Sequence, residues 1–179
     1  MPTLLDLFGV DKPRLVEGKS LLPLIEEEKM IREAAIYGMF GAGTNITDGR
    51  YTYFIYPEDM TKQDLFEYTL MPMRQKSLFP KEILADATLV KNFKFTDGVP
   101  LLKIPAQRNI KGQPVGHKGQ GGGYEDTTTV LYDLKNDPNQ IEPFRNKKIE
   151  AGLLNLLIKL MRQNEAPDEA FRRLGIDPK

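Results

Sequence analysis

The sequence predicts an α+β protein in which short strands share a core with a long helix near the C-terminus. Residues 34–40, 50–57 and 127–134 are rich in β-branched, aromatic and other apolar residues, which is typical of strands. Residues 147–163 instead repeat apolar residues at helical spacing. The chain has 179 residues, of which 40% are hydrophobic, and this suits one domain or slightly more.

The composition narrows the classes of function. Twenty-five basic residues offset 25 acidic ones, so no net positive field favours nucleic acid or a membrane surface as a partner. No segment approaches the roughly 20 apolar residues that span a bilayer, and the start of the chain lacks the basic residues of a signal peptide. The chain contains no cysteine, which excludes disulfides, thiolate metal sites and a cysteine nucleophile within it. These features do not identify the cellular compartment of the protein.

The N-terminal part predicts the last turns of a helix, followed by an irregular connection. Four large apolar residues cluster near the start: Leu4, Leu5, Leu7 and Phe8. Gly9 follows them, at a place where a helix would end. Residues 10–28 contain Pro13 and Pro23 and show few regular signals, so we expect a connecting strap.

Residues 37–57 predict a β-hairpin with a polar loop. The run 50–57 carries large apolar or aromatic side chains on both faces, which is typical of a central strand. The pair Asp48-Gly49 just before it is a strong turn signal. We therefore expect a loop ahead of the turn and a strand after it.

The predicted loop offers three polar side chains to a ligand. Thr44, Asn45 and Asp48 carry a hydroxyl, an amide and a carboxylate, which suit hydrogen bonding to a sugar or a polar aryl compound. The alternative is a local role, in which Asp48 makes the turn and Asn45 caps the backbone. We retain all three as candidate substrate-binding residues.

The middle of the chain gives weaker signals. Residues 61–70 and 80–90 have helix-like spacing with plausible helix starts. Residues 99–104 predict a short strand, and Pro100 indicates a sheet edge. Residues 105–126 predict a glycine-rich loop, which lacks the strand-then-helix setting of a phosphate-binding loop.

The only histidine, His117, lies in this glycine-rich loop. A histidine in such a loop is more often solvated than catalytic. We nevertheless add His117 to the candidate substrate-binding residues.

The C-terminal part is the most regular. Residues 136–140 predict a turn after the strand at 127–134. The helix predicted over 147–163 has one broad apolar stripe, made by Ile149, Leu153, Leu156, Leu157, Leu160 and Met161. Residues 166–179 predict one further short helix.

No complete catalytic constellation is visible. The two serines, Ser20 and Ser77, lie outside any nucleophile elbow. A single histidine excludes a multi-histidine metal site, and the carboxylates are scattered. We therefore assign no catalytic residue and no metal ligand.

Four segments occur in an order that resembles the C-terminal third of bacterial sulfatases of the alkaline phosphatase superfamily. They are PTLLDLFGV (2–10), EGKSLLPLI (17–25), NITDGRYTY (45–53) and LYDLKNDPNQ (131–140). Two more segments resemble a subgroup of these enzymes: YTLMPMR (68–74) and FKFTDGVPLLKI (93–104). The resemblance spans nearly the whole chain.

This resemblance implies that the chemistry belongs to a large N-terminal α/β domain. There a formylglycine, matured from cysteine or serine, attacks sulfur while a calcium ion polarises the sulfate oxygens. The family's motifs for these groups do not occur here, so we expect a truncated sulfatase that is inactive alone and holds no cofactor. Residues 1–25 would be the end of the large domain and a strap. Residues 26–179 would be the C-terminal subdomain, with about four antiparallel strands against the long helix.

The implied partner is the N-terminal sulfatase domain, or a second copy that associates through residues 1–25. Two alternatives stay open: a non-catalytic binding or interaction module with this fold, and a fragment of a related phosphatase or phosphonate monoester hydrolase. One departure concerns the hairpin loop. Relatives in the subgroup often have a pattern like G-G-H-V-N-V-T-D-G, whereas this chain has Gly43-Thr44 in place of the histidine and its neighbour. This difference indicates a different substrate or a decayed copy.

Overall fold

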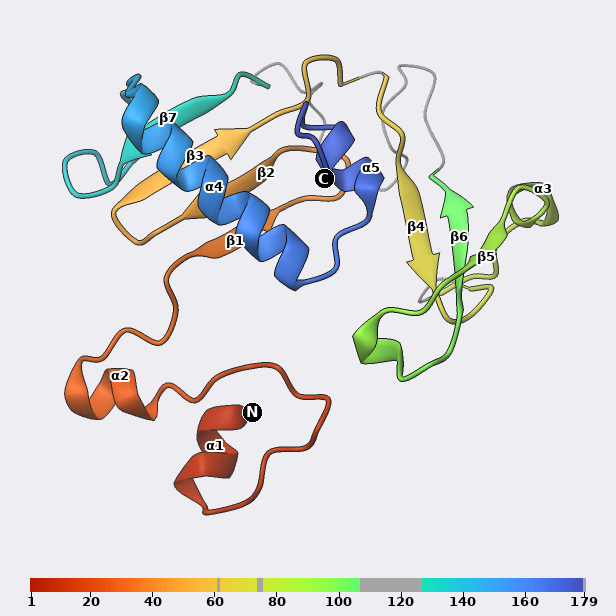
Figure 1. The fold of residues 1–179 in the computed structure, drawn as a ribbon, viewed down its shortest axis with the longest axis horizontal. Helices are drawn as coiled ribbons and strands as arrows, with labels where there is room; N and C mark the ends of the chain where they lie inside the picture. The colour runs from red at the N-terminus through yellow and green to blue at the C-terminus, as the bar shows by residue number, and fades with distance from the viewer. Residues whose placement is uncertain (61, 74–75, 107–126, 179) are drawn as a thin grey trace. The chain divides into compact units, whose positions relative to one another are not determined.

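The computed structural model describes residues 1–60, 62–73, 76–106 and 127–178 (Figure 1). The chain divides into two compact units, Met1–Ala35 and Ile36–Lys179. The second unit has the predicted α+β fold, with a four-stranded and a three-stranded antiparallel sheet and a long C-terminal helix. None of the helices in the described ranges is long and apolar enough to cross a membrane.

The first unit contains two short helices, α1 (Pro2–Leu7) and α2 (Leu22–Glu27). The helix α1 ends where predicted, since Gly9 follows with a φ of +64°, a left-handed value that suits glycine. The helix α2 lies within the predicted strap, because Pro23 is tolerated in the first turn of a helix. This compact unit extends past residue 25, and the origin of residues 1–25 in a larger domain stays a prediction.

The four-stranded sheet has the strand order β1-β2-β3-β7. Its strands are β1 (Ala35–Gly38), β2 (Thr44–Thr47), β3 (Tyr51–Ile55) and β7 (Val130–Asp133). The strand β3 is central, as predicted, and pairs antiparallel with both β2 and β7. The strands β1, β3 and β7 confirm the three strand predictions.

The strand β2 corrects the predicted loop. Thr44 and Asn45 lie in this strand, which pairs with β3 so that Ile46 faces Tyr53. Threonine and isoleucine favour a strand, but four residues are too few to stand out beside the neighbouring glycines. The hairpin therefore joins β2 to β3, and its turn lies at Asp48-Gly49 as predicted.

The helix α4 (Lys147–Gln163) spans the predicted range and covers one face of this sheet (Figure 1). Its start is capped by Asn146, whose side-chain oxygen accepts hydrogen bonds from the backbone N–H groups of Lys148 and Ile149 at 3.1 and 3.2 Å. The helix and the sheet share a buried core that includes Ile46, Leu131, Leu153, Leu157 and Met161.

The three-stranded sheet has the order β4-β6-β5 with antiparallel pairing. Its strands are β4 (Phe66–Thr69), β5 (Thr88–Val90) and β6 (Leu101–Pro105). Two short helices connect them, α3 (Lys81–Leu84) and η1 (Lys94–Thr96).

This second sheet corrects two predictions. The helix predicted over 61–70 is wrong, because that segment contains β4; short apolar runs fit helical and strand periods alike. The range 80–90 holds only the short α3 before β5 begins. The strand predicted over 99–104 exists as β6, but it is central rather than an edge. Pro100 precedes its first residue, so the proline removes no hydrogen bond from the ladder.

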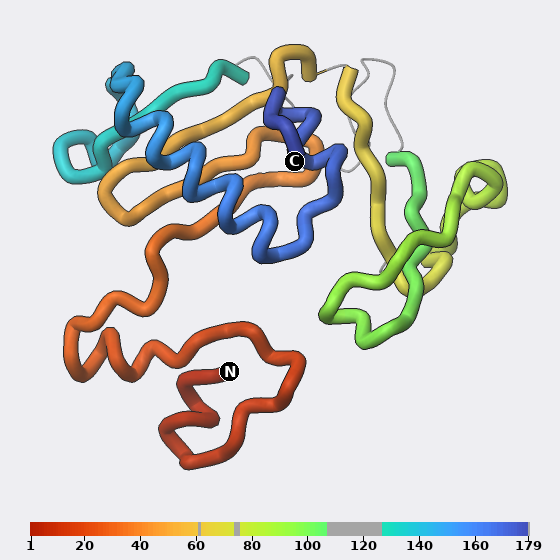
Figure 2. The backbone as a smooth tube through the Cα atoms, viewed as in Figure 1, coloured from red at the N-terminus to blue at the C-terminus, as the bar shows by residue number. Residues whose placement is uncertain are grey.

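The last helix, α5 (Asp168–Arg172), confirms the predicted short helix and lies between the two sheets (Figure 2). Its residue Glu169 accepts a hydrogen bond from Tyr68 of β4. Arg173, just after the helix, donates to Thr44 of β2. Through these contacts α5 connects both sheets, and the candidate site lies around it.

Candidate functional site

Arg173 joins three separate parts of the chain. Its Nε donates a hydrogen bond to Oε1 of Gln63 at 2.9 Å, and its Nη1 donates to Oγ1 of Thr44 at 3.4 Å. Its Nη2 donates to the backbone oxygen of Ala42. Because a guanidinium holds its donors in one plane, these three acceptors are fixed relative to one another.

Gln63 extends the network on its other side. This side chain belongs to a residue that is only 3% exposed. Its Nε2 donates to the backbone oxygens of Gly41 at 3.0 Å and of Met60 at 2.9 Å. The nitrogen and the oxygen of this buried amide therefore both have hydrogen-bond partners. Gln63 binds Gly41 and Arg173 binds Ala42, so two side chains fix the connection between β1 and β2.

Glycine lets this connection fold tightly. Gly38 has a φ of +153°, and a Cβ atom there would lie 2.5 Å from the backbone oxygen of Gly43. Any side chain at position 38 would therefore force the backbone apart. The connection over residues 39–43 is thus both tightly folded and pinned by Gln63 and Arg173.

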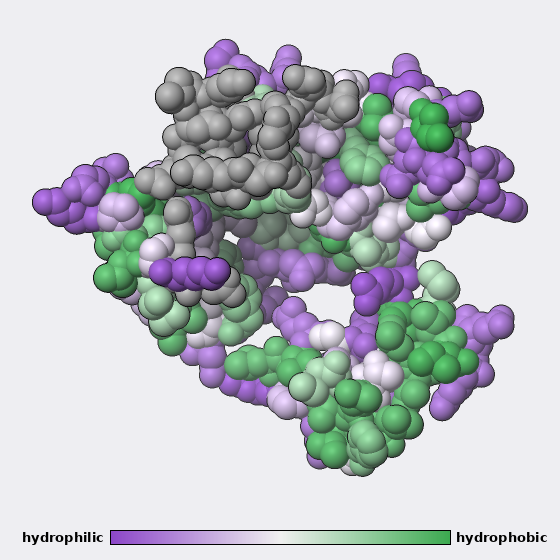
Figure 3. Space-filling view, turned by 180° about the vertical axis from the view of Figure 1, so that it is seen from behind, coloured by the Kyte–Doolittle hydropathy of each residue, from purple (hydrophilic) through white to green (hydrophobic). Residues whose placement is uncertain are grey.

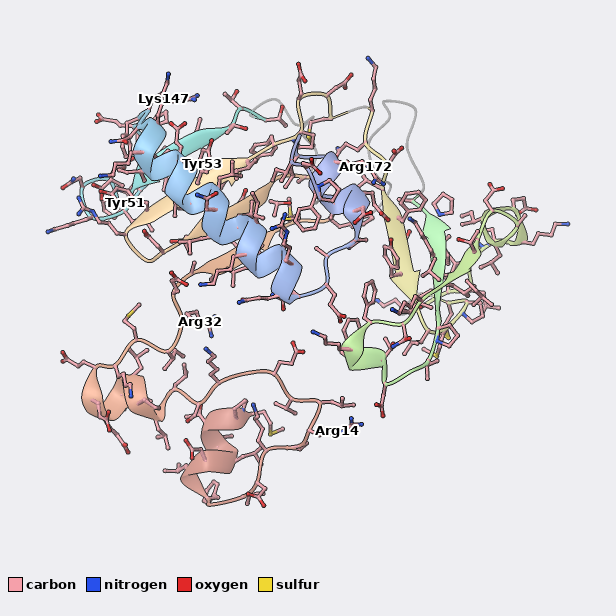
Figure 4. The ribbon with its side chains drawn as sticks, viewed as in Figure 1. Arg14, Arg32, Tyr51, Tyr53, Lys147 and Arg172 are labelled. Atoms are coloured by element: carbon pink, nitrogen blue, oxygen red, sulfur yellow. The ribbon has the colours of Figure 1, made fainter. Side chains whose placement is uncertain are left out.

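A cleft of about 500 Å³ opens beside this network. Its lining includes Tyr56, Thr129, Arg172 and Arg173, and Figure 4 shows Arg172 on α5. The side chain of Arg172 is 58% exposed, and its nearest carboxylate oxygens, on Asp168 and Glu169, are 3.9 and 4.0 Å away. The volume falls in the range of small-molecule sites.

The described lining of the cleft carries groups that suit the binding of a polar ligand. Among the residues that line it are two acids, Glu58 and Asp59, and a cation, Lys62, which lies 3.2 Å from Asp59. No serine, cysteine or histidine belongs to its described lining, so it offers no usual pairing of nucleophile and base. Its amide, hydroxyl and guanidinium groups suit recognition of a polar ligand, and Arg172 suits an anionic group.

A partly buried ion pair holds α5 against the three-stranded sheet. Nζ of Lys103 lies 2.7 Å from Oε1 of Glu169, and the hydroxyl of Tyr68 donates to the same oxygen. The ammonium group also lies 4.0 Å from the centre of the Phe66 ring. Glu169 is thereby anchored from both β4 and β6.

The pKa values of this cluster reflect its packing. Burial acts to raise the pKa of Glu169, but the hydrogen bonds from Lys103 and Tyr68 outweigh burial and lower it. Burial, followed by the hydrogen bond to Glu169, raises the pKa of Tyr68. Near neutral pH the carboxylate is ionised and the phenol is neutral, so this cluster stabilises α5 rather than exchanging protons.

Thr44 and Asn45, two of the residues singled out in the sequence, do not line the cleft themselves but lie near residues that do. Thr44 accepts from Arg173. Asn45 is 7% exposed, and its Oδ1 has no hydrogen-bond partner. A Cβ atom on Gly43 would lie 3.0 Å from this oxygen and 3.1 Å from the ring of Tyr56, which lines the cleft. The amide oxygen therefore lies near the cleft wall and caps no backbone group.

Asp48 has a local role. Its Oδ1 accepts hydrogen bonds from the backbone N–H groups of Arg50 at 2.9 Å and Tyr51 at 2.7 Å, which shapes the turn. It follows the last residue of β2, whereas Thr44 is the first, so the structure does not bring these two side chains together. His117 lies outside the described residues.

Two residues of the site, Gln63 and Arg173, were not indicated by the sequence. Their side chains meet across 110 positions of the chain. Neither residue belongs to a local motif, so only the three-dimensional fold reveals the contact. Within the described residues, no group of three or more histidine, cysteine, aspartate or glutamate side chains is placed to hold a metal ion.

Comparison with known proteins adds no family assignment. The sequence matches no protein-family model, and a search of curated proteins gives no match. The sulfatase resemblance therefore stands as a proposal that depends on the residues quoted above and on the fold.

Proposed function

We propose that this chain is the non-catalytic C-terminal subdomain of a sulfatase-type hydrolase of sulfate esters. The observation that supports this most is the architecture: a four-stranded antiparallel sheet against a 17-residue helix, the fold that the resemblance implies. The segment NITDGRYTY runs through the β2–β3 hairpin, and LYDLKNDPNQ runs from β7 into the following turn. The similar segments and the fold therefore support one another.

In this proposal the subdomain shapes a substrate entrance, and a separate α/β domain performs the chemistry. Thr44 and Asn45 lie beside a connection that Gln63 and Arg173 hold in place. A polar edge that is held in place can orient a substrate without supplying a nucleophile. Calcium and formylglycine belong to the separate domain, where they would supply a Lewis acid and a nucleophile. No residue described here is assigned to either group.

The exposed apolar residues of the first unit support a protein partner. In Met1–Ala35 the exposed large hydrophobic residues are Met1, Leu4, Leu7, Phe8, Val10, Leu15, Leu21, Leu24, Ile25 and Met30. Figure 3 shows apolar side chains gathered on one face of this unit. Such a concentration of apolar surface is typical of an interface. We assign it to contact with the catalytic domain or, without that domain, with a second copy.

Hydrolysis assays test the proposal. The full chain alone should release no nitrophenol from 4-nitrophenyl sulfate or phosphate, with or without calcium. A separately produced sulfatase α/β domain that lacks its own C-terminal subdomain should gain sulfatase activity as this chain is added, until the effect saturates. The variant Phe8→Asp should weaken the gain, whereas Leu89→Asp, an equally exposed site in the three-stranded sheet, should leave it intact.

The same assay has contradicting outcomes. Turnover by the purified chain alone would refute the non-catalytic role. A gain in phosphate hydrolysis rather than sulfate hydrolysis would indicate that the chain derives from a related phosphatase or phosphonate monoester hydrolase. No gain with any catalytic domain tested would leave the subdomain role without support.

The cleft beside α5 favours a second candidate function, an independent binding module. The cleft of about 500 Å³ is built from residues of this chain alone. Under this alternative the chain binds a small polar or anionic ligand without any catalytic domain. Isothermal titration with inorganic sulfate and with neutral methyl glycosides distinguishes the sulfatase subdomain from the independent binding module. Only the binding module predicts that the chain alone binds one of these ligands saturably and that Arg172→Ala weakens this binding.

A further inference from the structure

The two faces of the four-stranded sheet carry different side chains. Successive side chains along a strand point to opposite faces. One face packs on α4 and carries the buried Leu131 (Figure 1). On the other face, the register places Phe54 opposite Val130 and Thr52 opposite Tyr132. These four side chains therefore lie together on the face that α4 does not cover.

A cavity of about 250 Å³ lies on this second face. It is lined by Phe54, Tyr56, Thr128, Val130, Tyr132 and Gln140. All six residues belong to the second unit. The cavity adjoins the larger cleft beside α5, since Tyr56 lines both. Its volume is somewhat below that of sites for drug-sized ligands, so it suits a ligand of a single ring.

Aromatic rings form fixed walls of this cavity. The rings of Phe54 and Tyr132 have centres 5.8 Å apart and planes at 88°, so they make a corner. Phe54 also meets the ring of Tyr37 on β1, with centres 6.0 Å apart, and the Tyr37 hydroxyl is hydrogen-bonded to Thr52. The face of an aromatic ring is electron-rich, so it attracts the weakly positive C–H groups of a ligand.

The polar groups of the cavity are uncharged. They are the hydroxyls of Tyr56, Thr128 and Tyr132 and the amide of Gln140. None of the described lining residues carries a charge at neutral pH. An ion that entered would leave water without an opposite charge to pair with, which is unfavourable. The cavity therefore suits a neutral ligand, in contrast to the cleft beside α5, whose lining includes acids and arginines.

Gln140 presents its amide from a backbone position that favours smaller residues. Its φ is +55°, a left-handed value that glycine or asparagine adopts more readily. Its backbone N–H donates to the Asp137 oxygen at 3.1 Å, which closes the turn after β7. Gln140→Gly therefore removes the amide from the cavity without straining the turn. This substitution separates an effect on binding from an effect on folding.

We propose that this cavity binds one neutral sugar ring. The C–H groups on one face of a sugar ring match the aromatic corner of Phe54 and Tyr132. The hydroxyls around its rim match the hydroxyl and amide groups of the lining. A neutral ligand with an apolar face and several hydroxyls fits both sets of groups. This inference does not depend on the sulfatase proposal, because it concerns binding by this chain rather than hydrolysis.

A nuclear magnetic resonance titration of the full chain tests the proposal. The ligands are the methyl glycosides of glucose, galactose, mannose and N-acetylglucosamine. At least one should cause saturable shifts of backbone amides in β3 and β7. Its dissociation constant should be about 1 mM, since a single ring makes few contacts. Sorbitol, which has the hydroxyls of a sugar but no ring, should bind at least about tenfold more weakly.

Variants assign the binding to the cavity. Tyr132→Leu should weaken it about tenfold, because one aromatic wall and its hydroxyl are lost. Gln140→Gly should weaken it about fivefold and leave the thermal unfolding midpoint unchanged or higher. Tyr51→Leu is the matched control, because it removes a tyrosine next to Thr52 from the opposite face of β3 and should leave binding unchanged. Arg172→Ala in the neighbouring cleft should also leave it unchanged.

Several results would overturn the proposal. No saturable shift from any of the four glycosides would do so, as would binding that both Tyr132→Leu and Gln140→Gly leave intact. Equal binding of sorbitol would contradict the stacking on the rings. Binding of adenosine but of no glycoside would assign the cavity to a planar base. Weakening by Arg172→Ala would place the sugar in the cleft beside α5, and equal weakening by Tyr51→Leu would indicate a general effect on the sheet. Circular dichroism identifies any variant that is unfolded.

Discussion

The two compact units of this chain use apolar residues in opposite ways. In Ile36–Lys179 the sheet and α4 enclose a core in which Ile46, Leu131 and Leu157 have no exposed surface. In Met1–Ala35, by contrast, Ala34 is the only buried apolar residue, and Phe8 is 75% exposed. Apolar content alone therefore does not make a core. A core also needs enough secondary structure to enclose it.

The size of the first unit explains this difference. Chains below about 40 residues seldom bury enough surface to fold without a disulfide, a metal or a partner. The helices α1 and α2 are six residues each, which is too short to be stable without packing. The second unit has two sheets and a 17-residue helix to pack together. We infer that the first unit depends on a partner, whereas the second supports itself.

The largest predicted effect contrasts a leucine from each unit. Leu157→Ala should lower the free energy of unfolding by about 3 kcal/mol, because it removes a fully buried side chain and leaves a cavity. Leu7→Ala, at a residue that is 60% exposed, should change it by less than about 0.5 kcal/mol. Urea unfolding of both full-length variants measures the contrast. Equal losses would mean that residues 1–35 belong to the same core.

The next largest effect concerns the ion pair that anchors α5. Glu169→Gln leaves Lys103 without its counter-charge and should cost about 2 kcal/mol at pH 7. Asp168→Asn is a matched control on the same helix, because its side chain is 71% exposed, and it should cost little. A loss in the control as large as in Glu169→Gln would show that total charge, rather than the Lys103–Glu169 pair, is responsible.

The same ion pair predicts a pH dependence with a defined sign. The folded state lowers the pKa of Glu169 below its ordinary 4.5, so its contribution to stability is present above that pH and is lost as the pH falls through the lowered value. The folded state raises the pKa of Tyr68 above 10, so its contribution is lost as the pH rises beyond 10. The stability difference between the wild type and Glu169→Gln should shrink in acid. A difference that stays constant down to pH 3 would contradict the assignment.

A smaller effect should appear at the pinned connection between β1 and β2. Arg173→Lys keeps the charge but loses the planar donors to Gln63, Thr44 and Ala42, and should cost about 1 kcal/mol. Amide hydrogen exchange should increase over residues 39–44 and stay unchanged in α4. The control Arg172→Lys alters the neighbouring exposed arginine and should leave exchange in this segment unchanged. Unaltered exchange in Arg173→Lys would mean that other contacts fix the connection.

The smallest effect on the core should follow from removing residues 1–25. We expect the deletion to raise solubility, because it removes exposed apolar side chains, and to leave the unfolding midpoint nearly unchanged. Light scattering and thermal unfolding measure these two properties. A deletion that unfolds the remaining chain would place the strap within its core.

The sequence predicted the long helix and most strands of the second unit but missed the strands β2 and β4, for physical reasons. The helix over 147–163 repeats its apolar stripe over several turns, which leaves little ambiguity. The strand Thr44–Thr47 has only four residues and follows a run rich in glycine. The range 61–70 contains an apolar run too short to distinguish a helix from the strand β4.

The candidate site was only partly predictable from the sequence. Thr44 and Asn45 were recognised as polar groups with ligand chemistry, and both lie near the cleft. Asp48 turned out to shape a turn, which its place before Gly49 already indicated. Gln63 and Arg173 gave no local signal, because their roles depend on a contact between distant parts of the chain.

Amide hydrogen exchange on the full chain, followed residue by residue, tests the contrast between the units most directly. If the second unit supports itself and the first depends on a partner, backbone amides of α1 and α2 should exchange at nearly unprotected rates. Amides of β3 and α4 should be protected to the level of global unfolding. Protection of α1 and α2 equal to that of α4, in the monomeric chain, would contradict the account.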